Sequence, residues 1–162
     1  MYIKASMDLI QFIKRCPSVF HAVDAMKTEL KSEGFEELAE GKRWNLKKGN
    51  KYFVARNCSS IIAFKIGEEL DDYSFNIVAS HCDSPGFKIK DNYKIEANKK
   101  YVQLNTEKYG GMIYSSWFDR PLSVSGRVIA KNGDLFETKL VNIDKDLVLI
   151  PNVAIHMNRE VN

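Results

Sequence analysis

The residues best suited to chemistry in this sequence are His81 and Asp83, two positions apart in the segment at residues 80–85. The apolar run just before them, residues 75–80, predicts a strand that is covered on both faces of its sheet. Side chains two positions apart on a strand point the same way, so the imidazole and the carboxylate should share one side. An imidazole with a carboxylate beside it is common around bound metal ions. The pair therefore predicts a metal ligand, His81, oriented by Asp83.

The motif alone also fits a polar pair in a loop with no chemical role. Histidine is often only partly buried and aspartate favours turns, so this simpler interpretation stays open. Cys82, between the two residues, has the side chain of a thiol nucleophile. Neighbours on a strand point to opposite faces, which disfavours a Cys82 and His81 catalytic pair.

Two other places carry polar groups in an unusual setting. His156 ends the segment at residues 150–156, which is otherwise mostly apolar. Such an imidazole is either buried with its hydrogen bonds satisfied or displayed for use, and the sequence does not choose between them. Asp119 and Arg120, just before Pro121, form either an exposed ion pair or a structural strut.

A run of lysines with aromatic residues between them lies in the middle of the chain. Strands of this composition can bind single-stranded nucleic acid, but a solvated strand surface explains the run more simply. The net charge of +3 is also too small to indicate a polyanionic partner, so no nucleic-acid partner is expected. The residues are Lys88, Lys90, Lys94, Lys99 and Lys100, interleaved with Phe87, Tyr93 and Tyr101.

Elements that would position these residues can be predicted along the chain. Apolar residues at helical spacing predict two helices within the first 33 residues, with Ser18 as N-cap of the second, His21 packed in its apolar stripe and Gly34 as its end. Short β-branched and aromatic runs then predict strands and turns. Expected strands are residues 44–46, 52–56, 61–66, 75–80, 87–90, 93–96, 101–104, 123–129 and 135–137, with turns at 48–50, 57–59 and Asn132-Gly133.

Composition restricts the class of protein and its compartment. The 44% hydrophobic content suits a folded domain. Three cysteines without a CxxC pair indicate a reducing compartment, not a disulfide framework. The sequence contains neither the apolar core of a signal peptide nor the run of about 20 apolar residues that a membrane span needs. A cytoplasmic location with no membrane partner is therefore expected.

Motifs spread along the whole chain resemble the start of aspartyl aminopeptidases, a family of zinc peptidases. Eight blocks occur in the order found in that family, which is far more specific than any one of them. They are Pro17-Ser18-Val19-Phe20-His21-Ala22-Val23, Gly34-Phe35, residues 51–57, residues 59–64, Ala79-Ser80-His81-x-Asp83-Ser84-Pro85, Tyr109-Gly110-Gly111, Trp117-Phe118-Asp119-Arg120-Pro121-Leu122-Ser123 and Ile150-Pro151-Asn152-x-Ala154-Ile155-His156.

The resemblance implies an α/β fold. Residues 1–88 would be the first part of a mixed-sheet zinc-peptidase domain with helices packed on it, and residues 89–162 the start of a β-rich inserted dimerisation domain. The change from helices with strands to strands alone predicts a boundary at residues 85–92 independently. The family uses two zinc ions, and His81 matches its first zinc-ligating histidine, with Asp83 as the supporting carboxylate. His156 matches a histidine that reaches a neighbouring subunit's active site and helps to hold substrate.

Activity and assembly are also implied by the resemblance. The expected function is a metallo-aminopeptidase that releases N-terminal, especially acidic, amino acids from peptide substrates, working as a homo-oligomer. Cys82 stands where the family usually has threonine, which leaves the assignment of His81 intact. The other zinc ligands and the base have no match here, so this portion is expected to be inactive alone. The alternative is a non-catalytic remnant that acts as an assembly or binding module.

Overall fold

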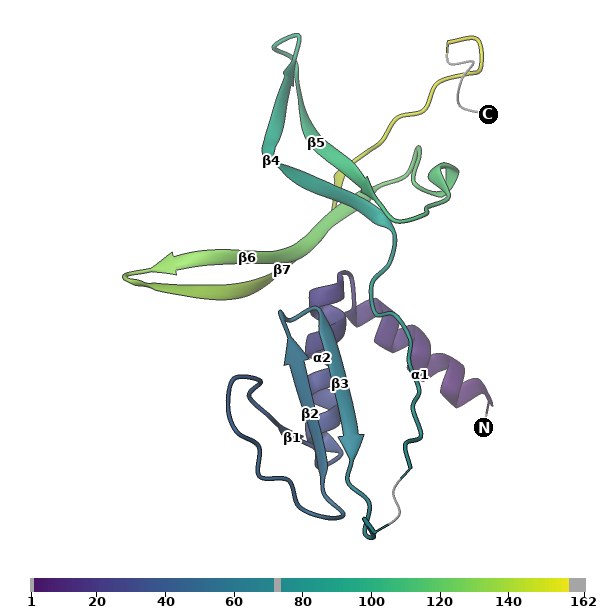
Figure 1. Cartoon of the computed structure of the whole chain (residues 1–162). Coiled ribbons are helices and arrows are strands. Elements are labelled where there is room, and N and C mark those ends of the chain that lie inside the picture. The colour runs from purple at the N-terminus through teal and green to yellow at the C-terminus, as the bar shows by residue number, and fades with distance from the viewer. Residues whose placement is uncertain (1, 72–73, 158–162) are drawn as a thin grey trace. The chain divides into compact units, whose positions relative to one another are not determined.

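The computed structural model of the chain describes residues 2–71 and 74–157. It begins with two helices, α1 (Tyr2–Arg15) and α2 (Val19–Ser32) (Figure 1). Helix α1 buries none of its residues, whereas α2 buries two. The two predicted helices are therefore confirmed, and α2 is the one that contributes to the core.

Both ends of α2 are fixed by local contacts. The Ser18 side chain accepts a hydrogen bond from the backbone N–H of His21, which satisfies a donor that the first helical turn cannot pair internally. At the other end, Gly34 has φ +80°, and the N–H of Phe35 donates to the Leu30 carbonyl at 2.9 Å. A left-handed glycine after the last turn is a common helix C-terminus. The predicted N-cap and the predicted stop are both confirmed.

Three strands form one mixed sheet, in the order β1-β2-β3. The short β1 (Glu36–Glu37) pairs in parallel with β2 (Lys51–Arg56), which pairs in antiparallel fashion with β3 (Ser60–Lys65). The two longer strands and the turn between them match the prediction. Strand β1 was not predicted, because two residues are too few to show a period-2 pattern.

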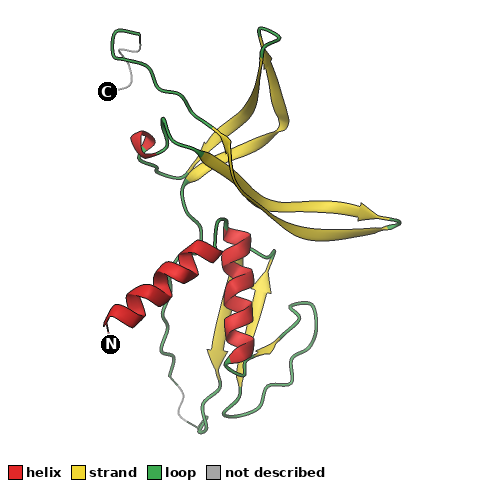
Figure 2. Cartoon of the chain, turned by 180° about the vertical axis from the view of Figure 1, so that it is seen from behind, coloured by secondary structure: helices red, strands yellow, loops and turns green. Residues whose placement is uncertain are grey.

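The core of this layer lies between α2 and the sheet. Helix α2 runs along one face of the sheet in both views (Figures 1 and 2). Within the described ranges the buried residues are Ala22 and Val23 of α2 and Tyr52 and Phe53 of β2. Full burial of a large apolar side chain stabilises a fold by about 1.5–3 kcal/mol. These few side chains therefore hold the helix on the sheet.

The strand predicted at residues 44–46 is wrong. The chain does turn at residues 48–50, where Gly49 has φ +74° and the Asn50 N–H donates to the Lys47 carbonyl at 3.3 Å, but the turn does not join two paired strands as predicted. Residues 44–46 lie in a loop. The indole N–H of Trp44 donates to the Ala39 carbonyl at 2.9 Å, and its ring lies 6.4 Å from the Phe64 ring, centre to centre. The aromatic residue thus packs against the sheet and is not part of it, a difference that composition does not reveal.

Two long hairpins follow. Strands β4 (Gly86–Ala97) and β5 (Tyr101–Tyr109) are antiparallel, and their register shifts near the middle of β4. The predicted strands at residues 87–90 and 93–96 are therefore one strand with an irregularity between its halves. A contact at this point joins the side chains of Asn105 and Asn92, with Nδ2 of the first 3.0 Å from Oδ1 of the second.

The second hairpin consists of β6 (Leu122–Asn132) and β7 (Leu135–Val148). Its turn contains Gly133 at φ +61°, a left-handed conformation that glycine adopts at little cost. The predicted Asn132-Gly133 hairpin turn is confirmed. Strand β6 exceeds its predicted range by a few residues, whereas β7 continues far beyond residues 135–137, because the strand pattern weakens where polar residues follow one another.

The chain divides into two compact units. One comprises the residues up to Asp83 together with Ser125–Asn142, and the other comprises Ser84–Val124 together with the residues from Ile143 onward. The mixed α/β character is as predicted, whereas the division into a peptidase domain and an insert stays a prediction. In the described part of the chain, no helix is long and apolar enough to cross a bilayer.

Candidate metal centre

The segment that carries His81 is extended but is not a strand, so that prediction is wrong. Residues 74–85 have no regular secondary structure. Phe75, Ile77 and Val78 are 79%, 82% and 99% exposed, so the apolar run is not covered. A buried strand needs neighbouring strands to pair with and layers on its faces, and none of the described strands pairs with this segment.

His81 and Asp83 nevertheless lie together. Nδ1 of His81 is 2.8 Å from the Asp83 carbonyl oxygen and 3.3 Å from its carboxylate Oδ1. A carbonyl oxygen only accepts, so Nδ1 carries the proton. In the neutral ring the lone pair is then on Nε2, and the imidazole is 82% exposed. The contacts thus fix the tautomer that presents Nε2 to a ligand from solvent.

Cys82 is held by a different part of the chain. Its thiol donates to the backbone carbonyl of Ser59 at 3.3 Å, in the turn between β2 and β3. The side chain is half-buried and is not directed at His81 by any contact. This attachment of the segment to the sheet was not predicted, because the two residues are 23 positions apart and no local pattern links them. The structure therefore offers no support for Cys82 as a nucleophile paired with His81.

His81 and Asp83 are a possible part of a metal centre, not a complete one. Zinc in proteins takes about three or four protein ligands, most often imidazole, thiolate and carboxylate. Over residues 2–71 and 74–157, no group of three or more such side chains could hold a metal ion. By donor chemistry the Nε2 atom of His81 fits zinc as a single ligand. The roles predicted for His81 and Asp83 stay predictions.

His156 is displayed on an exposed turn. The N–H of Met157 donates to the Ala154 carbonyl at 2.8 Å, which closes the turn around the imidazole. His156, Ile155 and Met157 are all exposed. Of the two alternatives that the sequence left open, the buried one is wrong, and the use of the imidazole stays a prediction. His21, in contrast, is half-buried and its Nδ1 lies 2.8 Å from the Ser18 hydroxyl, so it packs at the start of α2 as predicted.

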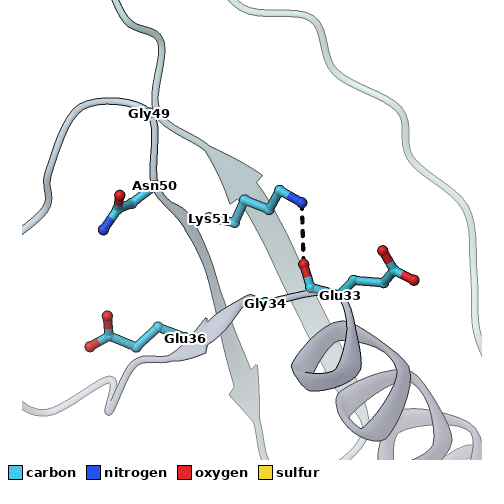
Figure 3. A pocket seen from close by; sticks show the side chains of 6 residues that line it. All are labelled: Glu33, Gly34, Glu36, Gly49, Asn50 and Lys51. Carbon is cyan, nitrogen blue, oxygen red and sulfur yellow. Dashed lines mark hydrogen bonds between the residues drawn. The ribbon is translucent and has the colours of Figure 1, made fainter.

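A shallow polar pocket of 370 Å³ lies at the end of α2 and the start of β2 (Figure 3). Lys51 donates from Nζ to the Glu33 carbonyl across it at 3.2 Å. None of the predicted site residues lines the pocket. Its lining residues are Glu33, Gly34, Glu36, Gly49, Asn50 and Lys51, without an imidazole or thiol, so it is not the predicted metal centre.

The basic strand surface is partly neutralised by its own glutamates. Lys88 lies 3.6 Å from Glu107, and Lys94 lies 2.7 Å from Glu96. A surface that binds a nucleic-acid backbone needs cations available to phosphates. These ion pairs therefore agree with a solvated strand surface.

Comparison with known proteins identifies the family. The sequence matches a family model described as "Aminopeptidase I zinc metalloprotease (M18)" over residues 12–162. This chain belongs to the M18 family. The resemblance to aspartyl aminopeptidases, which belong to it, is thereby confirmed.

Curated M18 relatives are similar over almost the whole chain. A probable M18 family aminopeptidase 2 of Clostridium novyi is 48% identical over 163 residues, which cover 99% of this chain and 38% of that protein. The aspartyl aminopeptidase of Dictyostelium discoideum is 44% identical, over 99% of this chain and 34% of that protein. The M18 chain thus spans little more than a third of the length of these relatives.

Solved M18 structures share its fold. A cryo-EM structure of the Ape4 and Nbr1 complex has a chain that is 40% identical, with a TM-score of 0.89, covering 94% of this chain and 30% of that one. The mApe1 dodecamer of S. cerevisiae is 25% identical, with a TM-score of 0.80 over 96% of this chain and 37% of that one. The chain therefore has the fold of part of an M18 aminopeptidase.

Proposed function

We propose that this chain is part of a zinc-dependent aminopeptidase, which removes single amino acids from the N-terminus of peptides. The observation that carries the proposal is the exposed His81 ring, whose Nδ1 is engaged by Asp83 so that Nε2 is available to a metal ion. The M18 match, to a family described as zinc metalloproteases, includes both residues. A carboxylate beside a ligating imidazole fixes its orientation and raises its basicity.

In this proposal His81 is a zinc ligand and Asp83 is the residue that positions it. Zinc, when bound, lowers the pKa of a water molecule and polarises the carbonyl of the peptide bond. We expect two zinc ions in the complete site, with the remaining ligands and the base outside these 162 residues. A single imidazole does not organise such a site, so the chain alone should have weak zinc affinity and little or no peptidase activity.

Residues 1–88 would form part of the catalytic domain, and residues 89–162 part of an inserted β-rich domain that makes dimer contacts. We assign His156 to substrate binding in the active site of a neighbouring subunit. Its exposure on the turn at residues 154–157 supports this role, because a residue that acts across an interface must be accessible before assembly. The preference for an acidic N-terminal residue follows the relative named aspartyl aminopeptidase.

Assembly and location complete the proposal. The chain would form a closed homo-oligomer, as the yeast mApe1 dodecamer does. Extensive exposed apolar surface, including Ile77 and Val78, is consistent with contacts to further protein. Three free thiols suit a reducing compartment, so a cytoplasmic location is proposed.

Zinc binding by the purified chain tests the metal assignment. Titration against a chromophoric chelator should show weak binding in wild type, loss of binding in His81→Ala, and unchanged binding in His156→Ala. The second variant is the matched control, because it removes an exposed imidazole that is assigned to substrate and not to zinc. Zinc affinity unchanged in His81→Ala would contradict the proposal.

Intact mass and zinc content of the natural gene product test the larger claim. A product several hundred residues long, with two zinc ions per chain and release of N-terminal aspartate or glutamate from peptides, is expected. A natural product of 162 residues that does not bind zinc would instead favour a non-catalytic assembly module. A high peptidase rate from the purified chain would contradict the claim that it lacks most of the active site.

A further inference from the structure

Asp119 makes two hydrogen bonds to the segment that leads to His156. Its backbone N–H donates to the Ile150 carbonyl at 3.0 Å, and its carboxylate Oδ1 accepts from the backbone N–H of Asn152 at 2.8 Å. The bonds reach the residues on either side of Pro151. The backbone and the side chain of Asp119 thus bind the two ends of the three-residue stretch 150–152.

The backbone of Asp119 is in the left-handed region, with φ +53°. Few residues other than glycine adopt this conformation readily, and asparagine and aspartate are the main exceptions. A strained backbone persists where the surrounding contacts fix it, and such positions are concentrated at functional sites. Here the fixing contacts are the two bonds to Ile150 and Asn152, in an exposed loop that has no other evident need for the conformation.

The loop that carries Asp119 is itself well anchored. The Trp117 ring meets the Phe87 ring of β4 edge-on, with centroids 5.4 Å apart. Arg120 donates from its guanidinium to the Ser116 carbonyl at 3.3 Å, which closes the loop on itself. Asp119 therefore lies between two anchored residues, Trp117 and Arg120. Through its bond to Asn152 it links the β4–β5 hairpin to the segment after β7.

The segment after β7 is attached at this point. Residues 149–157 contain no helix or strand. Two hydrogen bonds with Asp119 hold the start of the segment, at Ile150 and Asn152. Within the segment, the Asn152 side chain accepts from the Val153 N–H at 2.9 Å, and the turn around His156 follows directly.

We propose that Asp119 is a positioning residue for His156. Its two bonds fix the position of residues 150–152. Because the exposed turn begins just after these residues, the bonds also limit where the His156 imidazole can lie. This assignment resolves the two alternatives for Asp119 and Arg120 in favour of a strut. It rests on the proposed function only in that His156 is taken as the group to be positioned.

Three substitutions at one position separate the contributions of Asp119. Asp119→Asn keeps an oxygen acceptor and tolerates the left-handed backbone, Asp119→Gly keeps only the backbone freedom, and Asp119→Ala keeps neither. Asp134→Ala is the matched control, because it removes an exposed carboxylate from the hairpin turn after Gly133. The readout is amide hydrogen exchange of Asn152, together with heteronuclear NOE values for residues 153–157, measured by NMR on the purified chain.

Loss of the acceptor should free the segment. We expect exchange of the Asn152 amide to accelerate about tenfold or more in Asp119→Gly and Asp119→Ala, with lower NOE values around His156. Asp119→Asn should stay within about threefold of wild type, and Asp134→Ala should not differ from it. Amides of β4 and β5 serve as the internal reference for folding.

Wild-type protection of Asn152 in Asp119→Gly would overturn the proposal. Equal acceleration in the asparagine and glycine variants would overturn it as well, because the acceptor would then not be what holds the segment. If the glycine and alanine variants also lose protection in β4 and β5, they are unfolded and cannot be used. The asparagine variant then decides: acceleration of Asn152 exchange by more than about threefold would overturn the proposal. None of these readouts uses peptidase activity. A failure of the substrate role of His156 would be seen separately, as an unchanged KM when His156→Ala is made in the complete enzyme, so it is distinguished from a failure of the strut.

Discussion

The guanidinium of Arg127 lies 4.3 Å from the centre of the Phe20 ring. The same group donates to the backbone carbonyl of Asn57 at 2.7 Å and to its Oδ1 at 3.2 Å. Within one compact unit, a residue of β6 therefore joins the first turn of α2 to the turn between β2 and β3. Asn57 itself is left-handed, with φ +53°, which the contact to its carbonyl helps to maintain.

Arg127→Ala should lower the free energy of unfolding by about 1–2 kcal/mol, since it removes a cation–π contact and two hydrogen bonds. Arg127→Lys should recover only part of this loss, because an ammonium group cannot make both bonds in the plane of a guanidinium. Urea denaturation followed by circular dichroism gives the measurement. Lys131→Ala removes an exposed cation from the same strand and should have no effect beyond about 0.5 kcal/mol. Equal stability of the alanine variants at positions 127 and 131 would show that the contact contributes nothing.

Elements specified by local sequence were predictable. Ser18 and Gly34 delimit α2 through bonds to residues within a few positions, and Asn132-Gly133 fixes a hairpin by its own backbone preference. Such signals depend on short stretches of chain, so one sequence is enough to find them.

Features that depend on distant partners were not predictable. The apolar run at residues 75–80 has the composition of a buried strand, but pairing and burial require neighbours that the run does not specify. Arg127 and Asn57 are 70 positions apart, and nothing at either position indicates the other. In the candidate site, the proximity of His81 and Asp83 was predicted from strand geometry that the segment does not have. Their contact arises inside an irregular segment, where the His81 ring reaches the carbonyl and the carboxylate of Asp83, so the right neighbours were inferred from the wrong element.

Asp83 should affect zinc binding through His81. Asp83→Ala is expected to weaken the zinc affinity of the chain about tenfold, because carboxylates behind ligating histidines typically contribute that much or more. The bond to the Asp83 carbonyl would survive the substitution, so binding should weaken and not vanish. Cys82→Ala is the matched control and should leave the affinity within about twofold, since the thiol is bonded to Ser59. A larger effect of the cysteine variant than of the aspartate variant would mean that the thiol, not the carboxylate, belongs to the metal centre.

Val78 tests the correction to the predicted strand. With 99% of Val78 exposed, Val78→Asp should change the free energy of unfolding of the chain by less than about 0.5 kcal/mol. Val23→Asp places the same carboxylate at a position that is 1% exposed, and should cost more than about 3 kcal/mol or prevent folding. Thermal and urea unfolding of both variants give the comparison. A loss above about 2 kcal/mol in Val78→Asp would mean that this segment is buried in solution.

Glu37 should give the α2–β1 contact a dependence on pH. Its carboxylate lies 2.6 Å from Lys27 Nζ and 2.7 Å from Lys31 Nζ, and hydrogen bonds from these two ammonium groups hold the pKa of Glu37 below its usual value. A carboxyl whose pKa is depressed on folding stabilises the protein above the pKa that it has in the unfolded chain, about 4.3. That contribution is lost as the pH falls through the lower pKa of the folded state.

Glu37→Gln should therefore destabilise the chain by about 0.5–1 kcal/mol at pH 7, and the difference from wild type should shrink as the pH falls below about 4. The adjacent Glu36 has no ion pair among the described residues, so Glu36→Gln should match wild type at each pH. Urea unfolding at a series of pH values, in buffers of constant ionic strength, gives both curves. Because exposed ion pairs are screened, the effect at pH 7 should also diminish in about 1 M salt. If the difference in unfolding free energy between Glu37→Gln and wild type stays constant down to about pH 2.5, the loss would not come from the charge of Glu37. It would then come from packing of the side-chain methylenes, which protonation does not change.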